Sequence, residues 1–467
     1  MKTVTRPMAT KREYQSKNNQ NMKIRIIIGL FLFCCGVINA QEKKWTLEEC
    51  VYYAVENNLT IEQYELDLEN AKIDKSDAIG DMLPNFNANA SVSGNSGLVL
   101  DQSRNQQVTG TVTTASGGFS SSVNLFDGLR NIHRLNRAKL NALANQYRLD
   151  NLKDDIMLAV ANSYLQVLSN KESLKIFRAQ YAVTGQDLKR TKELVEAGVV
   201  PKGDLLEIEA TAANQEQQIV NSENQVLISR INLAQLLQIT DYVNFDIAEE
   251  EFDIPPSNIL DNSPKTIFDK ALTFRNDIKF SLSNVDLALK DLDIAKGAVY
   301  PTLGAFFNYG TRYSSEFRNP ITFNRIAFAD QLYLTDGIAY GLQLNIPVFN
   351  GFSVKNNIKR AKIGVERSRL QLKQDKLDLE TNINQAYVDV KSFSMAYEAA
   401  QKTLDARRLA YNYSKERFNV GLMNAFDFSQ SQSRVDDAEA VLIRTKYDYI
   451  FRLKVLEFYF GLPITLD

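Results

Sequence analysis

Few side chains in this sequence could carry out covalent or metal chemistry. The chain of 467 residues contains one histidine, His133, and three cysteines, Cys34, Cys35 and Cys50. Zinc sites and Cys/His catalytic sites need several such groups together, so their scarcity argues against these classes of enzyme. His133 lies beside an arginine in a helical pattern and is expected on the solvated surface. Cys50 lies in an apolar helical stretch and is expected to be a buried structural thiol.

Two carboxylates occupy equivalent places in the sequence. Asp204 lies six residues after Gly198, and Asp427 lies six residues after Gly421. Each aspartate is near the predicted beginning of a helix. A carboxylate there interacts favourably with the helix dipole, by about 0.3–1 kcal/mol. A glycine at the end of the preceding helix is first of all a C-cap. The two carboxylates would therefore act through their charge, and their effect depends on where the neighbouring helices place them.

The composition excludes several functional classes. Hydrophobic residues make up 44% and charged residues 24% of the chain, values near those of globular proteins, which excludes a wholly disordered or collagen-like chain. A net charge of −2 gives no basic footprint for nucleic acid. The mean hydropathy of −0.27 argues against a polytopic helical membrane protein.

Residues 1–40 are predicted to be a secretory signal peptide. A basic segment at 22–25 precedes an apolar run at 26–37 and the small cleavage-site residue Ala40. The preceding residues form an overlong n-region, so Met22 is an alternative start to Met1 and Met8. Lipidation at one of the cysteines of the leader fits poorly, because a bulky or cysteine residue precedes each. Removing the leader leaves 47 basic and 55 acidic residues, a net charge of −8.

The rest of the chain is an internal duplication. The tripeptide Arg-Ala-Lys at 137–139 recurs at 360–362, and the same separation relates 126–204 to 349–427 without gaps. Upstream the separation is shorter, so the second copy has a longer loop between 301 and 349. The sequence predicts a first repeat at 41–240, a connection at 241–264 and a second repeat at 265–467.

Each repeat is predicted to run helix, strand, loop, strand, long helix, tight turn, helix. The predicted helices are 47–81, 129–196 and 205–238 in the first copy, and 267–297, 352–420 and 425–458 in the second. The two longest contain no proline, and at 1.5 Å per residue each reaches roughly 100 Å. Compact domains do not contain such helices, so a coiled coil or helical bundle is the starting interpretation.

The strands show a period of two. Four segments of about ten residues, near 86–93, 119–125, 303–310 and 338–346, alternate apolar residues with Asn, Ser, Gly and Gln, and Phe306 is an exception. This pattern is typical of outer-membrane barrel strands, although a half-buried soluble sheet gives the same alternation. Four strands cannot close a spanning barrel, because the smallest have eight. If the strands cross a membrane, several protomers must share one barrel.

Together these features resemble the TolC outer-membrane efflux family. The resemblance covers about 45–463, and its motifs are WTLEEC at 45–50, ENNL at 56–59, LFDG at 125–128, VFNG at 348–351, AGVV at 197–200 and RFNVGLM at 417–423. It implies a mostly α fold with a small β part. Duplicated antiparallel helices would form a periplasmic α-barrel, and four strands per protomer would contribute to a trimeric 12-stranded outer-membrane β-barrel.

The resemblance also implies a function and partners. The chain would be the outer-membrane subunit of a tripartite efflux or type I secretion system, a passive conduit for drugs, metabolites or proteins. It would act as a homotrimer with a periplasmic adaptor protein and an inner-membrane pump. Neither catalytic residues nor a cofactor is implied. The connection 241–264 would join an equatorial collar around the helices.

Particular residues take roles by this resemblance. The helix-tip turns, with Gly198, Val199, Val420, Gly421 and Leu422, would dock into the adaptor. Among the matches to the family's periplasmic aperture, Asp427 would supply a ring of three carboxylates. The other matching positions are Asp204, Gln430, Phe418 and Met423. A second acidic residue of the family falls at Gln430, and its aperture Tyr and Arg fall at Phe418 and Met423, so this pore is expected to be gated differently.

One alternative function remains open from the sequence. An exported structural coiled-coil protein without channel activity would have the same helices, with its strands forming a soluble sheet. The residues specify neither the transported cargo nor the class of the inner-membrane pump.

Overall fold

The computed structural model describes residues 43–101, 106–249, 253–319 and 321–463. The predicted signal peptide, with Cys34 and Cys35, lies outside the described residues. The elements in chain order are β1 (Lys44–Trp45), α2 (Leu47–Asn57), α3 (Leu59–Gly80), β2 (Asn85–Asp101), β3 (Gln106–Phe126), α4 (Arg130–Glu196), α5 (Lys202–Leu236), β4 (Asp246–Ile247), η1 (Ile259–Asp261), α6 (Pro264–Phe274), α7 (Asn276–Gly297), β5 (Thr302–Ser314), α8 (Phe328–Leu334), β6 (Gly337–Asn345), α9 (Ser353–Asn419) and α10 (Ala425–Tyr459).

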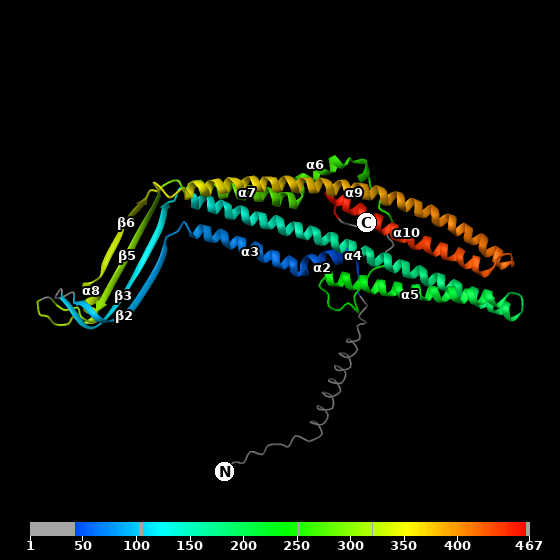
Figure 1. The fold of residues 1–467 in the computed structure, drawn as a ribbon, viewed down its shortest axis with the longest axis horizontal. Helices are drawn as coiled ribbons and strands as arrows, with labels where there is room; N and C mark the ends of the chain where they lie inside the picture. The colour runs from blue at the N-terminus through cyan, green and yellow to red at the C-terminus, as the bar shows by residue number, and fades with distance from the viewer. Residues whose placement is uncertain (1–42, 102–105, 250–252, 320, 464–467) are drawn as a thin grey trace, which may run out of the picture.

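The molecule is elongated, with its large sheet at one end and its helices extending away from it (Figure 1). The antiparallel sheet has the order β2-β3-β5-β6. The shorter helices α3 and α5 lie one after the other along α4, and α7 and α10 lie in the same way along α9 (Figure 1). The turns α4–α5 and α9–α10 form the end farthest from the sheet. The predicted mostly α fold with a small β part is therefore confirmed.

The two long helices have the predicted length. The helices α4 and α9 have 67 residues each, which corresponds to about 100 Å at 1.5 Å per residue. Neither contains a proline, and so no backbone hydrogen bond is lost inside them. Within the part of the chain that the structure describes, no helix combines the length and the apolar character needed to cross a membrane.

The first helix of each copy is broken, and here the predicted single helices over 47–81 and 267–297 are wrong. Asn58 adopts extended backbone angles between α2 and α3, and its side chain accepts a hydrogen bond of 2.9 Å from Thr60 N. In the second copy Arg275 occupies the break between α6 and α7, and its guanidinium bonds Asp277 at 2.7 Å. Local side-chain bonds of this kind compete with helical hydrogen bonds, and a period-based reading does not detect them.

The strand-to-helix junction of the first copy packs directly on the second copy. Gly128 has φ of +74°, and a Cβ at this position would lie 2.1 Å from the carbonyl oxygen of Gly297. Only glycine permits this approach of two backbones. Next to it, the Asp127 carboxylate accepts a hydrogen bond from Asn131 N at 3.0 Å and so caps the beginning of α4. The beginning of α4, directly after the sheet, is therefore packed against the end of α7.

The apolar core lies midway along the helices. One cluster surrounds the fully buried Tyr164 and includes Cys50, Leu237 and Ile247, while a second surrounds Ile383 of α9. Burying each large apolar side chain contributes about 1.5–3 kcal/mol. The third cluster, nearer the helix tips, is much smaller and includes Leu404. Apolar packing is therefore strong at the middle of the molecule and weaker toward the tips.

Candidate functional site

The sheet has two chemically different faces. One face carries exposed apolar side chains; those more than 60% exposed are Phe86, Val92, Leu98, Phe119, Ile338, Tyr340 and Leu342. The strand register places Ala88 opposite Phe119 and Phe307 opposite Tyr340, so these apolar residues share that side of the sheet. Such a surface in contact with water is unusual in soluble proteins and indicates an apolar environment.

The opposite face of the sheet is polar. Ser91 Oγ lies 2.8 Å from Ser116 Oγ, and Ser93 Oγ lies 2.8 Å from Thr114 Oγ1, which connects β2 to β3 through hydroxyl groups. Apolar exceptions on this face are Phe306, as in the sequence pattern, and the buried Val112, which the register pairs with Asn95. The Phe306 ring lies over Gly341, where a Cβ would approach the ring to 3.1 Å. The outer strands β2 and β6 each have one edge without a strand partner in the described residues.

The two turns at the far end of the helices have the same C-cap geometry. Gly198 and Gly421 have φ of +72° and +76°. At the first turn Val199 N donates to the Leu194 carbonyl at 2.9 Å, and at the second Leu422 N donates to the Arg417 carbonyl at 2.8 Å. These six-to-one bonds define Schellman motifs, which glycine completes without strain.

Apolar side chains at these turns extend into solvent. Val199, Val420 and Leu422 are each about two-thirds exposed. Adaptor docking at these positions stays a prediction, because no partner contact tests it. An apolar tip on an otherwise polar pair of helices is nevertheless the surface composition expected of a docking site.

Four of the residues assigned to the aperture lie in or near the α9–α10 turn. Phe418 stacks on the buried ring of Phe428 with 4.6 Å between centroids, so it connects the end of α9 to α10. Asp427 is exposed in the first turn of α10, and its backbone N donates to the Asn424 side chain at 2.8 Å. Met423 lies in the turn itself. Gln430 is exposed and accepts a hydrogen bond from Arg434 at 3.2 Å.

The fifth aperture position is on the other turn. Asp204 lies half-buried in the first turn of α5. The ends of the two long helices are linked near these turns, where Arg190 Nη1 of α4 donates to Asn419 Oδ1 of α9 at 2.6 Å. The structure therefore brings the predicted residues to one end of the molecule, but it holds Asp204 and Asp427 on separate helix pairs.

Above the tips, polar side chains join the two copies. We call this set the polar belt; it consists of Gln180, Thr184, Gln215, Gln432, Asp436 and Glu439. Gln432 donates to Thr184 at 2.7 Å, Gln180 donates to Glu439 at 2.9 Å, and Gln215 donates to Asp436 at 3.0 Å. The Arg408 guanidinium also bonds Glu439, at 2.7 Å. The tips of the two copies are thus held by hydrogen bonds rather than by a large apolar core.

Asp436 is the most perturbed carboxyl in this belt. It is 6% exposed, and its burial raises its pKa to about 7. The hydrogen bond from Gln215 favours the charged form and lowers the pKa, but this effect is smaller than that of burial. The neighbouring carboxylates Glu439 and Asp437 raise the pKa further. The side-chain oxygen Oε1 of Gln215 is buried without a hydrogen-bond partner. A protonated Asp436 supplies a donor of the kind that this oxygen lacks.

Sequence reasoning did not identify the polar belt. Its signal is present, because Gln432, Asp436 and Glu439 recur at helical spacing on a helix that also buries Val435 and Ala438. Polar residues on the same face as buried apolar ones indicate an interior hydrogen-bonding surface. This spacing could have been read from the sequence, but the partners on the other copy could not.

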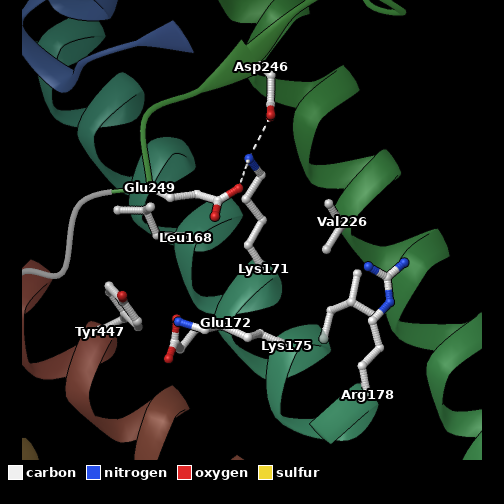
Figure 2. A pocket seen from close by; sticks show the side chains of 10 residues that line it. Leu168, Lys171, Glu172, Lys175, Arg178, Val226, Asp246, Glu249 and Tyr447 are labelled. Atoms are coloured by element: carbon white, nitrogen blue, oxygen red, sulfur yellow. Dashed lines mark hydrogen bonds and ion pairs between the residues drawn. The ribbon is translucent and has the colours of Figure 1, made fainter.

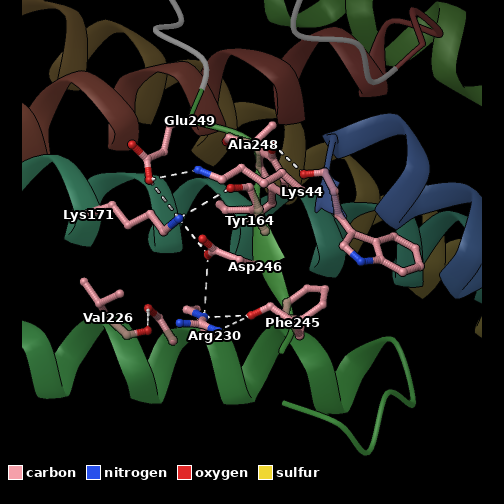
Figure 3. A network of polar contacts seen from close by, with 12 residues as sticks. Lys44, Tyr164, Lys171, Val226, Arg230, Phe245, Asp246, Ala248 and Glu249 are labelled. Carbon is pink, nitrogen blue, oxygen red and sulfur yellow. Dashed lines mark hydrogen bonds and ion pairs between the residues drawn. The ribbon is translucent and has the colours of Figure 1, made fainter. Parts of the chain in front are cut away.

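A second polar network lies at the middle of the molecule, where β1 pairs with β4 in parallel (Figure 3). Lys171 of α4 forms ion pairs with Asp246 at 2.6 Å and with Glu249 at 3.2 Å. Arg230 Nε of α5 donates to the Phe245 carbonyl at 2.9 Å. The network fastens part of the 241–264 connection to the first helix pair, the place expected for an equatorial collar.

Beside this network is an open cleft of about 570 Å³, lined mainly by α4 (Figure 2). Its basic side chains Lys171, Lys175 and Arg178 follow one face of the helix. Lys171 is occupied by the ion pairs above, and Arg178 pairs with Glu223 at 2.6 Å. The charges of the cleft are thus largely compensated, as in a structural network.

The reactive side chains singled out by the sequence analysis within the described residues are Cys50 and His133. Cys50 is fully buried, as predicted, and burial raises its pKa to about 12. His133 is half-buried, and its Nδ1 is shielded without a hydrogen-bond partner, so the expected solvated position is wrong. It lies in the first turn of α4, close to the packed junction with the sheet. Among the described residues, no cluster of His, Cys, Asp or Glu is arranged to hold a metal ion.

Comparison with known sequences identifies related proteins. The sequence profile described as outer membrane efflux protein matches residues 51–237 and 267–462. The chain is 23% identical over 316 residues to the outer membrane protein TolC of Vibrio cholerae, and 22% identical over 333 residues to the alkaline protease secretion protein AprF of Pseudomonas aeruginosa. These alignments cover 65% and 70% of this chain, and 66% of each relative, just under two thirds of its length.

Solved structures share the fold over nearly the whole chain. The outer membrane protein VceC of Vibrio cholerae superposes with a TM-score of 0.75 at 15% identity, covering 90% of this chain and 97% of that one. The outer membrane channel CmeC of Campylobacter jejuni superposes with a TM-score of 0.73 at 17% identity, covering 89% and 85% of the two chains. At these identities the likeness concerns the fold.

Proposed function

The chain belongs to the outer membrane efflux protein family, and on this premise we propose that it is the outer-membrane channel subunit of a tripartite efflux or type I secretion system. It provides a passive conduit for drugs, metabolites or proteins that an inner-membrane pump delivers. Its sheet lies in the outer membrane and its helices extend into the periplasm. Relatives named for protease secretion and for pyoverdine export indicate that the fold serves both large and small cargo.

One observation carries this proposal: the four-stranded sheet is apolar on one face, polar on the other, and unpaired at both edges within the described residues. In a membrane, unpaired backbone groups at a sheet edge cost several kcal/mol each. Pairing β2 of one protomer with β6 of the next satisfies both edges. Three protomers then form a closed barrel of twelve strands, within the size range of bacterial barrels.

The alternative, an exported structural coiled coil, accounts less well for the sheet. In that protein the apolar face would lie in water, with Phe86 81% and Tyr340 79% exposed. The same side chains contribute favourably when they face lipid. The family membership also favours the channel.

Two measurements test the channel. The protein should fractionate with the outer membrane and run as a trimer in mild detergent. Purified trimers should then form discrete conductance steps in planar bilayers. A protein that is extracted without detergent and runs as a filament or monomer would refute the proposal in favour of the coiled coil.

We assign two roles to the helix tips within this function. Val199, Val420 and Leu422 dock against the periplasmic adaptor, supported by their exposure beside the C-cap glycines. Leu422→Cys should crosslink to the cognate adaptor. Leu370→Cys, at a similarly exposed position near the sheet end of α9 and far from the tip, should not. Equal crosslinking at the two positions, or none at any tip position, would refute the docking role.

The second role is a ring of carboxylates from Asp427 at the periplasmic aperture, supported by its exposure in the first turn of α10. Three such charges around one axis bind multivalent cations. Cobalt hexammine added from the periplasmic side should block wild-type trimers and should block Asp427→Ala trimers weakly. Asp405→Ala, which removes an exposed carboxylate of α9 about four turns before the helix tip, is the matched control. Equal block of wild type and Asp427→Ala would exclude the ring.

A further inference from the structure

The large sheet carries a single charged side chain among the positions whose side chains the structure describes, and this is Arg312 of β5. The register pairs Arg312 with Ser116, which in turn pairs with Ser91. The hydroxyl groups of these two serines bond each other on the polar face. Arg312 therefore belongs to the polar face, opposite to the apolar residues of the same strand.

The position of Arg312 is fixed by its backbone. Pairing between β5 and β6 ends at Gly310 and Gly337, two residues before Arg312. At Arg312 the Thr335 side chain replaces the strand partner in bonding the backbone. Arg312 N donates to Thr335 Oγ1 at 3.1 Å, and the same hydroxyl lies 2.6 Å from the Arg312 carbonyl oxygen. The folded segment containing α8 thus holds the strand in place at this residue.

The guanidinium of Arg312 has no ion pair or side-chain hydrogen bond within the described part of the chain, and the residue is exposed. It borders a hollow of about 520 Å³ that is lined on the polar face by Ser116, Gly118, Asn308 and Gly310. Gly118 and Gly310 pair across the two strands and carry no side chain that would fill the hollow, and a Cβ at Gly118 would lie 2.5 Å from the Tyr309 carbonyl oxygen. An uncompensated cation thus lies beside hydroxyl and amide groups in an open recess.

We propose that Arg312 is the binding group of an anion site in the channel wall, repeated three times around the trimer axis, which attracts solutes that carry carboxylate or phosphate groups. This inference rests on the proposed function, because the three-fold barrel turns the polar face into the wall of a lumen. The guanidinium binds such groups through paired hydrogen bonds. The hydroxyl of its strand neighbour Ser116, and the amide of Asn308 four residues away along β5, add neutral donors to the same hollow.

The ring has a measurable effect on ion selectivity. Three unit charges about 10 Å from the axis, in a water-like dielectric and screened by 0.1 M salt, raise the anion density at the centre about twofold and lower the cation density about twofold. The ratio of anion to cation permeability therefore changes by about fourfold when the charges are removed. The effect decreases at high salt, because the Debye length shortens.

Single-channel recording in a potassium chloride gradient tests the site. Arg312→Gln should shift the reversal potential toward cation selectivity, and Arg312→Lys should retain the wild-type value. Arg325→Gln is the matched control: it removes a cation from the folded segment after β5, where Arg325 is 63% exposed and Glu316 keeps a second partner in Arg318. Inorganic pyrophosphate should interrupt the current of the wild type more often than that of Arg312→Gln.

The outcomes separate this inference from the proposed function. If purified wild-type trimers give no conductance, the channel itself fails. If Arg312→Gln trimers conduct normally but keep the wild-type reversal potential and the wild-type response to pyrophosphate, the channel stands and the anion site is refuted. If Arg325→Gln shifts the reversal potential as much as Arg312→Gln, selectivity depends on positive charge near the end of the strands in general. The site in the channel wall is then also refuted.

Discussion

Raising the pH from 5 to 8 should loosen the contact between α10 and α5 through ionisation of Asp436. The pKa of this carboxyl is raised from 3.8 to about 7, mainly by burial. The folded state therefore binds the proton more tightly than an opened state in which the carboxyl is solvated. Between these two pKa values stability falls as the pH rises, by about 1.4 kcal/mol per pH unit. From pH 5 to pH 8 the loss is about 3 kcal/mol, most of it below pH 7, and little is lost above pH 8.

The groups around Asp436 strengthen this direction. Glu439 and Asp437 on α10 repel the ionised form, and the Tyr411 hydroxyl of α9, whose pKa burial raises to about 12, stays neutral across this range. Arg408 is the nearby cation, and it is engaged with Glu439. Gln215 remains the direct hydrogen-bond partner of Asp436.

Amide hydrogen exchange of residues 429–440 measures the effect. After correction for intrinsic exchange rates, opening of this segment in wild-type protein should be about a hundredfold more frequent at pH 8 than at pH 5, since about 3 kcal/mol corresponds to that ratio. Asp436→Asn, which stays neutral and keeps an acceptor for Gln215, should lose most of the pH dependence. Asp437→Asn removes the same charge from the next, exposed residue and should retain it. If Asp436→Asn keeps the full pH dependence, the reasoning is refuted.

Three further predictions concern the tips and the core. Gly421→Ala should destabilise the α9–α10 turn by about 1–2 kcal/mol, because φ of +76° is strained for alanine. Faster proteolysis at this turn measures the loss. Gly364→Ala, inside α9 near the sheet end with open space around it, should show no such loss. Phe428→Ala should lower the stability of the tip by about 3–5 kcal/mol through loss of a fully buried ring, measured by exchange protection of α10, and unchanged protection would contradict its role. Cys50 should resist iodoacetamide at pH 8 in the native protein and react rapidly in denaturant, because burial raises its pKa to about 12; rapid native labelling would contradict the buried site.

The sequence predicts the large elements well, because their signals are long and regular. Proline-free helical patterns indicated both long helices to within about a residue at each end. The strands were harder to delimit. In the first copy β2 and β3 have 17 and 21 residues, although the alternating patterns suggested about ten. Gly, Ser and Thr near the outer ends of these strands weaken the alternation, and only pairing between the strands extends them.

The candidate site was predicted in part. The turns at Gly198 and Gly421 were found because glycine at a helix end has a definite conformational reason. The contact between Gln215 and Asp436 joins residues 221 positions apart, and its distance of 3.0 Å depends on how the two copies pack. The burial that perturbs Asp436 is likewise a property of that packing. A single sequence carries the polar spacing but not the partner across the interface.

The length of α4 and α9 has a mechanical consequence. A rod of 67 residues is about 100 Å long, so rotation by 3° about the packed junction at Gly128 and Gly297 displaces its far end by about 5 Å. A lever of this length converts a tilt that scarcely disturbs the sheet into a movement comparable to the width of a side chain. The tips can therefore separate when the long helices tilt, and no helix has to unfold. The free-energy cost of this separation comes mainly from breaking the hydrogen bonds of the polar belt.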